Sequence, residues 1–321
     1  MDKKNKLSNI WPVIVLYILS PVIAELLFGS TPASRSGQLI FESFFYGSGA
    51  LLIRDIARRY KLGWTSVIVF GIAFGVIEEC LLLQSAFNPH FLGNDLSFGR
   101  TVGVNWVWAE FIIGYHSIWS ITIPVLLTEL VFPDKSNQPW LSKTGLGITS
   151  GIYILSCVAF YTTFQKLTGF STSFIHYLIS GLVALALIAL AFNLPSNRTI
   201  KYKLKIRSSF ITGLIAFGGS IFWLFLFSLI FKQGSGLPAW IIEALGAVTI
   251  LVMTFLIAGG LEQIRSDKYR FSLAFGCLMA SLLFGLFVLI QSNNILDQVC
   301  QIIFIAISVG LLILLKRRRL N

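Results

Sequence analysis

Charged side chains are scarce in this chain. Only 12% of its 321 residues are charged and 55% are hydrophobic, whereas soluble domains carry about 25% charged residues. The mean hydropathy is +0.80. This composition excludes a soluble globular fold and predicts an all-α, polytopic bundle of transmembrane helices.

Cysteine and histidine are also few, with four and three residues respectively. The cysteines lie in or beside apolar runs, without a CxxC pair or a zinc-finger spacing, and are expected to be small buried side chains. No HExxH motif is present, so no cofactor is expected. Two histidines and several glutamates on separate segments keep zinc open as a variant of the site.

The net charge of +11 does not indicate nucleic acid, because the basic residues stand in short clusters between apolar runs of about 20 residues. The expected partner is the lipid bilayer. Ten apolar segments are long enough to cross it. They lie near residues 9–28, 37–56, 63–84, 105–131, 143–163, 174–193, 207–231, 238–260, 270–290 and 295–315.

The distribution of Lys and Arg orients these segments. Twenty of the 25 basic residues lie in the intervals on the N-terminal side, four lie on the opposite side, and Arg54 lies within the second segment. By the positive-inside rule, this bias places both termini in the cytoplasm. The expected location is the plasma membrane of a bacterium.

Polar residues concentrate in the first six segments. We therefore predict a six-helix functional half over residues 1–195 and an apolar four-helix half over residues 196–321. The halves show no repeat that would indicate an inverted-repeat transporter. The outer loop from Gln84 to Val104 is expected either to cap the mouth of a cavity or to be held at the surface by its aromatic residues.

The pair Glu78-Glu79 lies in the third segment, about 8 Å below its outer end at a rise of about 1.5 Å per residue. Glu110 of the fourth segment lies at a similar depth, and His116 lies about 16 Å down. Such groups are functional candidates, because each is costly in hydrocarbon without a partner. The same outer layer contains Glu25 and Glu42.

Adjacent residues on an α-helix point about 100° apart. We therefore expect one of Glu78 and Glu79 to face a cavity and the other to face a neighbouring helix or His116. Close carboxylates in a low dielectric do not all ionise, so one is expected to hold a proton beside another that acts as a base. For His116, a structural hydrogen bond to Glu79 or Glu110 is the alternative to a catalytic role.

Other polar and small residues are expected to join helices. Arg54 and Glu129, near the inner ends of the second and fourth segments, are expected to form an ion pair. The same layer could instead line an inner gate. Gly71 and Gly75 have the GxxxG spacing that permits close contact between membrane helices.

A double glutamate on one membrane helix, with one histidine on the next helix and another on a later one, resembles the CAAX-protease and bacteriocin-processing superfamily of intramembrane glutamic endopeptidases. The motifs of that family are EExxxR, FxxxH and HxxxN or HxxxD. Glu78 and Glu79 match the first motif, His116 the second and His176 the third. The departures are Leu83 in place of arginine, Phe111 five residues before the histidine, and Ser180 in place of Asn or Asp.

The resemblance implies that a glutamate and a histidine activate water to hydrolyse a peptide bond. The leading hypothesis is an integral membrane hydrolase of the glutamic protease kind, acting on a membrane-associated peptide or protein. Glu78 or Glu79 would be the base, and His116 the partner for the oxyanion or the proton. Glu110 and His176 would support them. The alternatives are a proton-coupled transporter that uses the same carboxylates and a non-catalytic membrane protein whose polar groups only join helices.

Overall fold

The computed structural model describes residues 10–194, 208–259 and 266–319. The fold is all-α and 81% helical. The α-helices are α2 (Ile10–Pro21), α3 (Gln38–Glu42), α4 (Ser48–Arg59), α5 (Trp64–Val76), α6 (Trp106–Tyr115), α7 (Ile123–Val131), α8 (Lys143–Thr168), α9 (Phe174–Asn193), α10 (Ser209–Ser228), α11 (Ala239–Gly259), α13 (Asp267–Ile290) and α14 (Ile295–Arg319). The predicted boundary between two halves, at residues 195 and 196, lies outside the described residues.

Shorter elements interrupt or connect these helices. The π-helical segments are η1 (Val22–Leu26), η3 (Ser43–Gly47), η4 (Ile77–Leu82) and η6 (His116–Thr122). The 3-10 segments are η2 (Ala33–Arg35), η5 (Phe91–Gly93), η7 (Pro133–Lys135) and η8 (Leu229–Gly236). Strands β1 (Arg100–Thr101) and β2 (Val104–Asn105) pair antiparallel, with Arg100 opposite Asn105. Each π-helical segment directly adjoins an α-helix, so several long helices are α-helical in part and π-helical in part.

Seven of the described helices are long and apolar enough to cross a membrane. They are Trp64–Leu82, Trp106–Val131, Lys143–Thr168, Phe174–Asn193, Ser209–Gly236, Asp267–Ile290 and Ile295–Arg318, and two shorter apolar helices are Ile10–Leu26 and Ala239–Met253. A multi-span all-α protein is thus confirmed, whereas the number of ten spans is not. The second predicted span forms an unbroken helix from Gln38 to Arg59, but it carries too many charged residues to join the apolar group.

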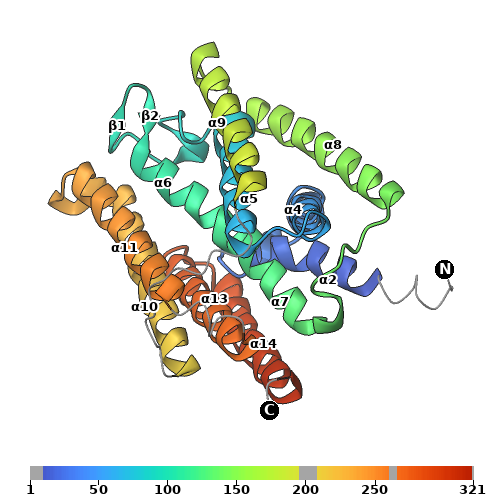
Figure 1. Cartoon of the computed structure of the whole chain (residues 1–321). Coiled ribbons are helices and arrows are strands. Elements are labelled where there is room, and N and C mark those ends of the chain that lie inside the picture. Colours follow the sequence, from blue (N-terminus) through green and yellow to red (C-terminus); the bar gives the residue numbers. More distant parts are fainter. Residues whose placement is uncertain (1–9, 195–207, 260–265, 320–321) are drawn as a thin grey trace.

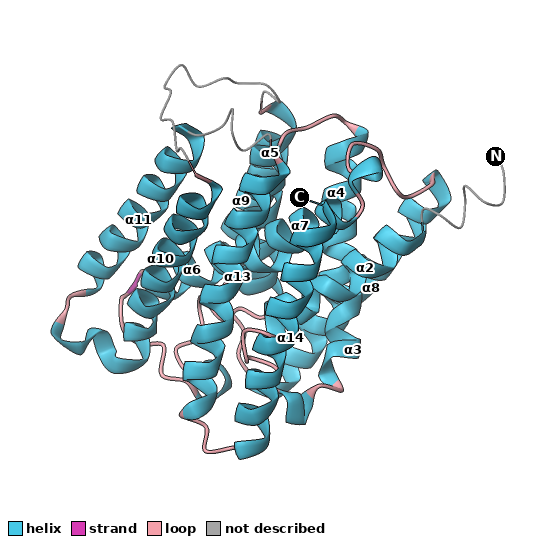
Figure 2. Ribbon diagram, turned by 90° about the horizontal axis from the view of Figure 1, so that it is seen from below, coloured by secondary structure: helices cyan, strands magenta, loops and turns pink. Residues whose placement is uncertain are grey.

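The helices form a bundle whose early members pack against α4. Figure 1 shows α4 nearly end-on, and α2, α5 and α8 pack against it. The long helix formed by α6, η6 and α7 passes between this group and the later helices, because α13 contacts α7 and α11 contacts α6. Within the later group, α10 packs closely along α13. Figure 2 shows that most helix axes run roughly side by side, as expected of a membrane bundle.

Three peripheral helices, α8, α9 and α14, turn large apolar side chains outward. Leu155, Leu185 and Leu311 are 71%, 64% and 61% exposed. Such faces are stable against hydrocarbon, where apolar side chains need no protein cover. The helix from Trp106 to Val131 is in contrast mostly buried. The polar residues that this central helix carries are therefore shielded from lipid.

Two glycines bring α5 close to the central helix. A Cβ atom on Gly71 would lie 2.9 Å from Cα of Ser117, and one on Gly75 would lie 3.0 Å from Cα of Ile113. These contacts confirm that the GxxxG pair permits close helix packing. A Cβ atom on Gly75 would also lie 3.4 Å from the Cβ of His116. The close contact at Gly75 therefore sets the distance between His116 and the helix that carries the glutamates.

The loop from Leu83 to Asn105 covers one end of the bundle, which we call the loop end. Phe87 and Phe91 of this loop are buried, and Leu96 is only 1% exposed. The loop is therefore held in place by its own aromatic and aliphatic side chains, which agrees with the second of the two expectations for it.

Asn105 fixes the start of α6 and is fully buried. Its side-chain oxygen accepts a hydrogen bond from the Trp108 amide at 2.8 Å, and its side-chain nitrogen donates to the Leu96 carbonyl at 2.7 Å. Asn105→Ala removes this cap and leaves the carbonyl without a donor, so we expect a loss of about 1–3 kcal/mol in the free energy of unfolding, measured by SDS titration. An equal loss in Asn94→Ala, at an exposed position of the same loop, would contradict the capping role.

Candidate functional site

Glu78, Glu79 and His116 meet inside the bundle. The Nε2 atom of His116 lies 2.9 Å from Oε1 of Glu79, and its Nδ1 atom lies 3.2 Å from Oε2 of Glu78. The two glutamates are 1% and 3% exposed and the histidine is 2% exposed. One imidazole therefore stands between two buried carboxylates. We call these three residues the Glu-His cluster.

Both glutamates reach the same imidazole, although adjacent residues of an α-helix point about 100° apart. Two features explain this result. The pair lies in η4, whose wider turns reduce the angle between neighbours, and the imidazole offers one ring nitrogen to each carboxylate. The expected division, with one glutamate facing a cavity and the other a neighbour, is thus replaced by two glutamates that face one histidine.

The four π-helical segments of the described chain all carry residues of this neighbourhood. Glu25 lies in η1, Tyr46 in η3, the glutamate pair in η4 and His116 in η6. Residues in π-helical turns are rare, well under 1% of all residues, and such turns often occur at functional sites. Four such segments around one cluster indicate that the helices are shaped to bring these side chains together.

Hydroxyl groups hold the outer atoms of the cluster. The contacts are Tyr46 Oη donating to Glu78 Oε1 at 2.5 Å, Ser85 Oγ donating to Glu79 Oε2, and Ser120 Oγ lying 2.9 Å from His116 Nδ1. The indole nitrogen of Trp108 in turn donates to Ser85 at 2.8 Å. Each ionisable side chain of the cluster thus has one atom in contact with a hydroxyl and another directed toward its neighbours.

Glu25 links the cluster to the surface at the loop end. The hydroxyl of Ser30, an exposed residue, donates to Oε2 of Glu25 at 2.5 Å. Glu25 lies near the Tyr46 hydroxyl, which donates its hydrogen bond to Glu78. A line of polar groups therefore runs from the surface through Glu25 and Tyr46 to the cluster. Glu25, one of the carboxylates expected in the outer layer, thus lies near the Glu-His cluster.

Two residues that the sequence assigned to the site lie elsewhere. Oε1 of Glu110 lies 2.8 Å from the position of a Cβ on Gly246, so this side chain is directed toward α11. The ring of His176 stacks on Phe87 with centroids 4.7 Å apart, and its Nε2 atom lies 3.1 Å from the carbonyl oxygen of Val102. The structure brings neither residue to the Glu-His cluster, and we leave both out of the site.

Sequence reasoning missed the three hydroxyl residues. Ser120 follows His116 by one helical turn, a spacing at which side chains are neighbours, so pattern analysis could have found it. Tyr46 comes from a different helix and Ser85 from the loop. No local spacing in the sequence indicates that either residue reaches the cluster.

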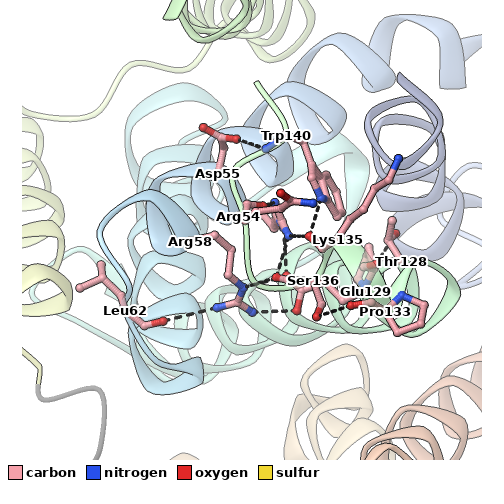
Figure 3. Close-up of polar contacts among 12 residues, drawn as sticks. Arg54, Asp55, Arg58, Leu62, Thr128, Glu129, Pro133, Lys135, Ser136 and Trp140 are labelled. Carbon is pink, nitrogen blue, oxygen red and sulfur yellow. Dashed lines mark hydrogen bonds and ion pairs between the residues drawn. The ribbon is translucent and has the colours of Figure 1, made fainter. Parts of the chain in front are cut away.

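A second buried polar group closes the opposite end of the bundle, which we call the basic end. Figure 3 shows the guanidinium groups of Arg54 and Arg58 directed toward Glu129 and the loop that follows it. Arg54 lies 2.9 Å and Arg58 lies 2.8 Å from Oε1 of Glu129, which confirms the predicted pairing of Arg54 with Glu129. Asp55 accepts a hydrogen bond from the Trp140 amide at 2.7 Å and pairs with Arg59 at 2.8 Å. These charges are therefore paired with one another or with the backbone, as in a structural tie between helices.

A family model described as an uncharacterized membrane protein family matches residues 14–317. No curated protein and no solved structure matches the chain. The resemblance to the CAAX-protease and bacteriocin-processing superfamily is therefore wrong, because nearly the whole chain matches a different family. The structure gives a physical reason, since His176, which carried the third motif, lies apart from the glutamates. Motifs with only two or three defined letters did not suffice to assign the family.

Proposed function

We propose, from the premise that the chain belongs to this uncharacterized membrane protein family, that it is an integral membrane hydrolase acting on a membrane-associated peptide or protein. The observation that carries the proposal is the buried imidazole between two carboxylates, placed there by π-helical turns. At the basic end, the buried carboxylate of Glu129 is paired with two permanently charged arginines, as suits a structural tie. The Glu-His cluster instead places two carboxylates on one imidazole, a group that gains and loses a proton near neutral pH. A structural tie does not explain why a second glutamate contacts His116 or why π-helical turns place these residues. Both features suit a site that moves protons.

The proposed reaction is hydrolysis of a peptide bond. One carboxylate of the Glu-His cluster accepts a proton from water while the water oxygen attacks the carbonyl carbon. The carbon–nitrogen bond then breaks, and the imidazolium gives its proton to the leaving amine. The other carboxylate stabilises the imidazolium by its negative charge. Acid–base groups of this kind contribute about 10²–10⁴-fold to a rate.

We place this chemistry on the outer side of a bacterial plasma membrane, with both termini in the cytoplasm. The distribution of basic residues supports this orientation by the positive-inside rule. The line of polar groups from Ser30 through Glu25 to Tyr46 supports access for water from the loop end. The substrate would then present its scissile bond at the outer boundary of the bilayer.

A proton-coupled transporter is less well supported. Transport requires polar access from both ends, and the basic end is occupied by paired charges. Arg54, Asp55 and Glu129 are 0%, 1% and 6% exposed. A buried charge with a full set of partners is costly to separate, by about 3–5 kcal/mol when one partner is removed. This end is therefore suited to holding helices together.

The test compares cells that express the wild-type chain with cells that express Glu79→Gln. We expect new N-termini on membrane proteins in wild-type cells, identified by terminal-amine mass spectrometry, and at least a roughly 10²-fold lower yield in the variant. When the reaction runs in ¹⁸O-labelled water, each new carboxyl group should gain one labelled oxygen.

Glu110→Gln is the matched control for this test. It removes a carboxylate from the same long helix as His116, but one that is directed toward α11. Its cleavage products should equal those of the wild type. Equal products from Glu79→Gln and the wild type, with the same amount of each protein in the membrane, would overturn the proposed function.

A further inference from the structure

We infer that Glu78, Glu79 and His116 bind one divalent transition-metal ion, for which zinc is the probe. One ligand atom from each residue can be chosen so that all three lie within 4.8 Å of one another. Neighbouring ligands of a tetrahedral zinc ion with bonds of about 2.0–2.2 Å lie about 3.3–3.5 Å apart. The 2.9 Å between His116 Nε2 and Glu79 Oε1 is close to this value. Glu78 Oε2 lies 3.2 Å from the other ring nitrogen, Nδ1, so its side chain or the imidazole would have to turn to complete the site.

One oxygen of the cluster is left without a hydrogen bond. Oε2 of Glu78 is buried and has no hydrogen-bond partner among the described residues, although Oε1 of the same carboxylate accepts from Tyr46. A buried acceptor without a donor costs about 1–3 kcal/mol, and more when it is charged. This oxygen is directed toward His116, 3.2 Å from its Nδ1 atom. A cation between the three side chains would give it a partner.

The hydrogen bonds around the cluster resemble the outer shell of a metal site. A histidine that binds a metal usually has its other ring nitrogen hydrogen-bonded, and carboxylate ligands are hydrogen-bonded in turn. The corresponding contacts here are Ser120 at His116 Nδ1, Tyr46 at Glu78 Oε1 and Ser85 at Glu79 Oε2. The atoms left for the metal are His116 Nε2, Glu78 Oε2 and Glu79 Oε1.

The balance of charge favours a divalent ion. When the imidazole is neutral and both glutamates are ionised, as metal binding requires, two negative charges lie among residues that are each at most 3% exposed, and isolated buried charges are very costly. Their other partners, Tyr46 and Ser85, are neutral hydroxyls. One divalent ion neutralises both carboxylates. The nitrogen ligand favours zinc or a neighbouring transition metal over magnesium and calcium, which take oxygen ligands.

This inference deepens the proposed hydrolysis, because a metal with three protein ligands keeps a fourth position for the attacking water. Zinc lowers the pKa of bound water to about 7, which supplies hydroxide at neutral pH. The three side chains would then serve as ligands, so that metal-bound hydroxide would replace the carboxylate base, and the proton of that hydroxide would pass to the leaving amine in place of the imidazolium proton. Metal binding itself does not depend on the activity, and loss of Glu79 abolishes cleavage in either version.

The experiment uses the full-length protein, purified in detergent, stripped with a chelator and incubated with Zn²⁺ alone. Elemental analysis should find one zinc ion per chain in the wild type and in Glu110→Gln. Glu79→Gln and His116→Ala should bind at least about 10²-fold more weakly, because each removes a ligand. Tyr46→Phe keeps all three ligands and should weaken binding by about 10–100-fold, as expected for an outer-shell partner. Cobalt in place of zinc should give the visible absorption of a four-coordinate ion.

Zinc binding at background level in the folded wild-type protein would overturn the inference, and so would equal binding by His116→Ala. Unchanged affinity in Tyr46→Phe would also count against it, and this variant does not remove a ligand that folding could require. The two proposals fail separately. Zinc binding at background level in a protein that still cleaves contradicts the metal site alone, whereas a bound metal without any cleavage contradicts the hydrolase alone.

Discussion

An Arg54→Met variant is expected to lose about 1–3 kcal/mol of unfolding free energy, because the Gln138 carbonyl loses its Arg54 donor inside the protein while Glu129 keeps Arg58 as its partner. The side chain of Arg54 is 0% exposed, and its Nε atom pairs with Glu129 at 2.9 Å. Its terminal nitrogens donate to the carbonyls of Gln138 at 2.7 Å, Lys135 at 3.0 Å and Ser136 at 2.8 Å. Methionine has a similar length but no donor for these four acceptors.

Arg54→Lys separates charge from geometry. Lysine keeps the positive charge near Glu129, but it lacks the planar fork that reaches three carbonyls and stacks on the Trp140 ring at 3.5 Å. We expect an intermediate loss of stability in SDS titration of the purified protein. If Arg54→Met unfolds at the wild-type SDS concentration, the loop between α7 and α8 must be held by other contacts, and the structural role assigned to the basic end is wrong.

Gly276→Leu is expected to disrupt the packing of α10 on α13. A Cβ atom on Gly276 would meet the carbonyl oxygen of Gly213, and it would lie 2.8 Å from the backbone nitrogen of Phe217 and 3.0 Å from Cβ of Ala216. Backbone atoms cannot move aside as the end of a flexible side chain can. Overpacking in a well-packed core costs about 1–3 kcal/mol, and we expect a loss at the upper end of this range or beyond it.

Gly218→Leu provides the control, because Gly218 lies in α10 and a Cβ there would have no neighbour within 4 Å. Both substitutions replace glycine by the same good helix former, so the gain in helix propensity is common to the two. The difference between their unfolding midpoints in detergent measures the steric effect alone. Equal midpoints would show that α10 and α13 do not pack this closely in the protein.

The features that the sequence predicted well depend on composition and on depth. Apolar runs show where helices form, and a fixed rise per residue shows how far along a helix a side chain lies. This reasoning was enough to pair Arg54 with Glu129, to assign Gly71 to a close contact and to suggest that His116 could bond to Glu79. All three predictions depend only on how far along a helix axis each residue lies.

The features that could not be predicted depend on rotation about that axis. Glu110 lies near the start of the Trp106–Val131 helix, as expected, but it is directed toward α11. Its direction is set by packing among helices that are distant in sequence. Tyr46 and Ser85 show the same limit, because each reaches the cluster only through the way its own segment is placed in the bundle. The π-helical turns have no recognised signature in the sequence and change the rotation further.

The π-helical turns have a consequence for how this chain tolerates changes in length. Each such turn accommodates an extra residue within an otherwise regular helix. Deleting one residue from η4 would let Trp64–Leu82 return to regular α-helical winding while the helix kept its place in the bundle. The fold could then survive a shortening that turns Glu78 or Glu79 away from His116, so the loss of the site and the loss of the bundle are separable events in this architecture.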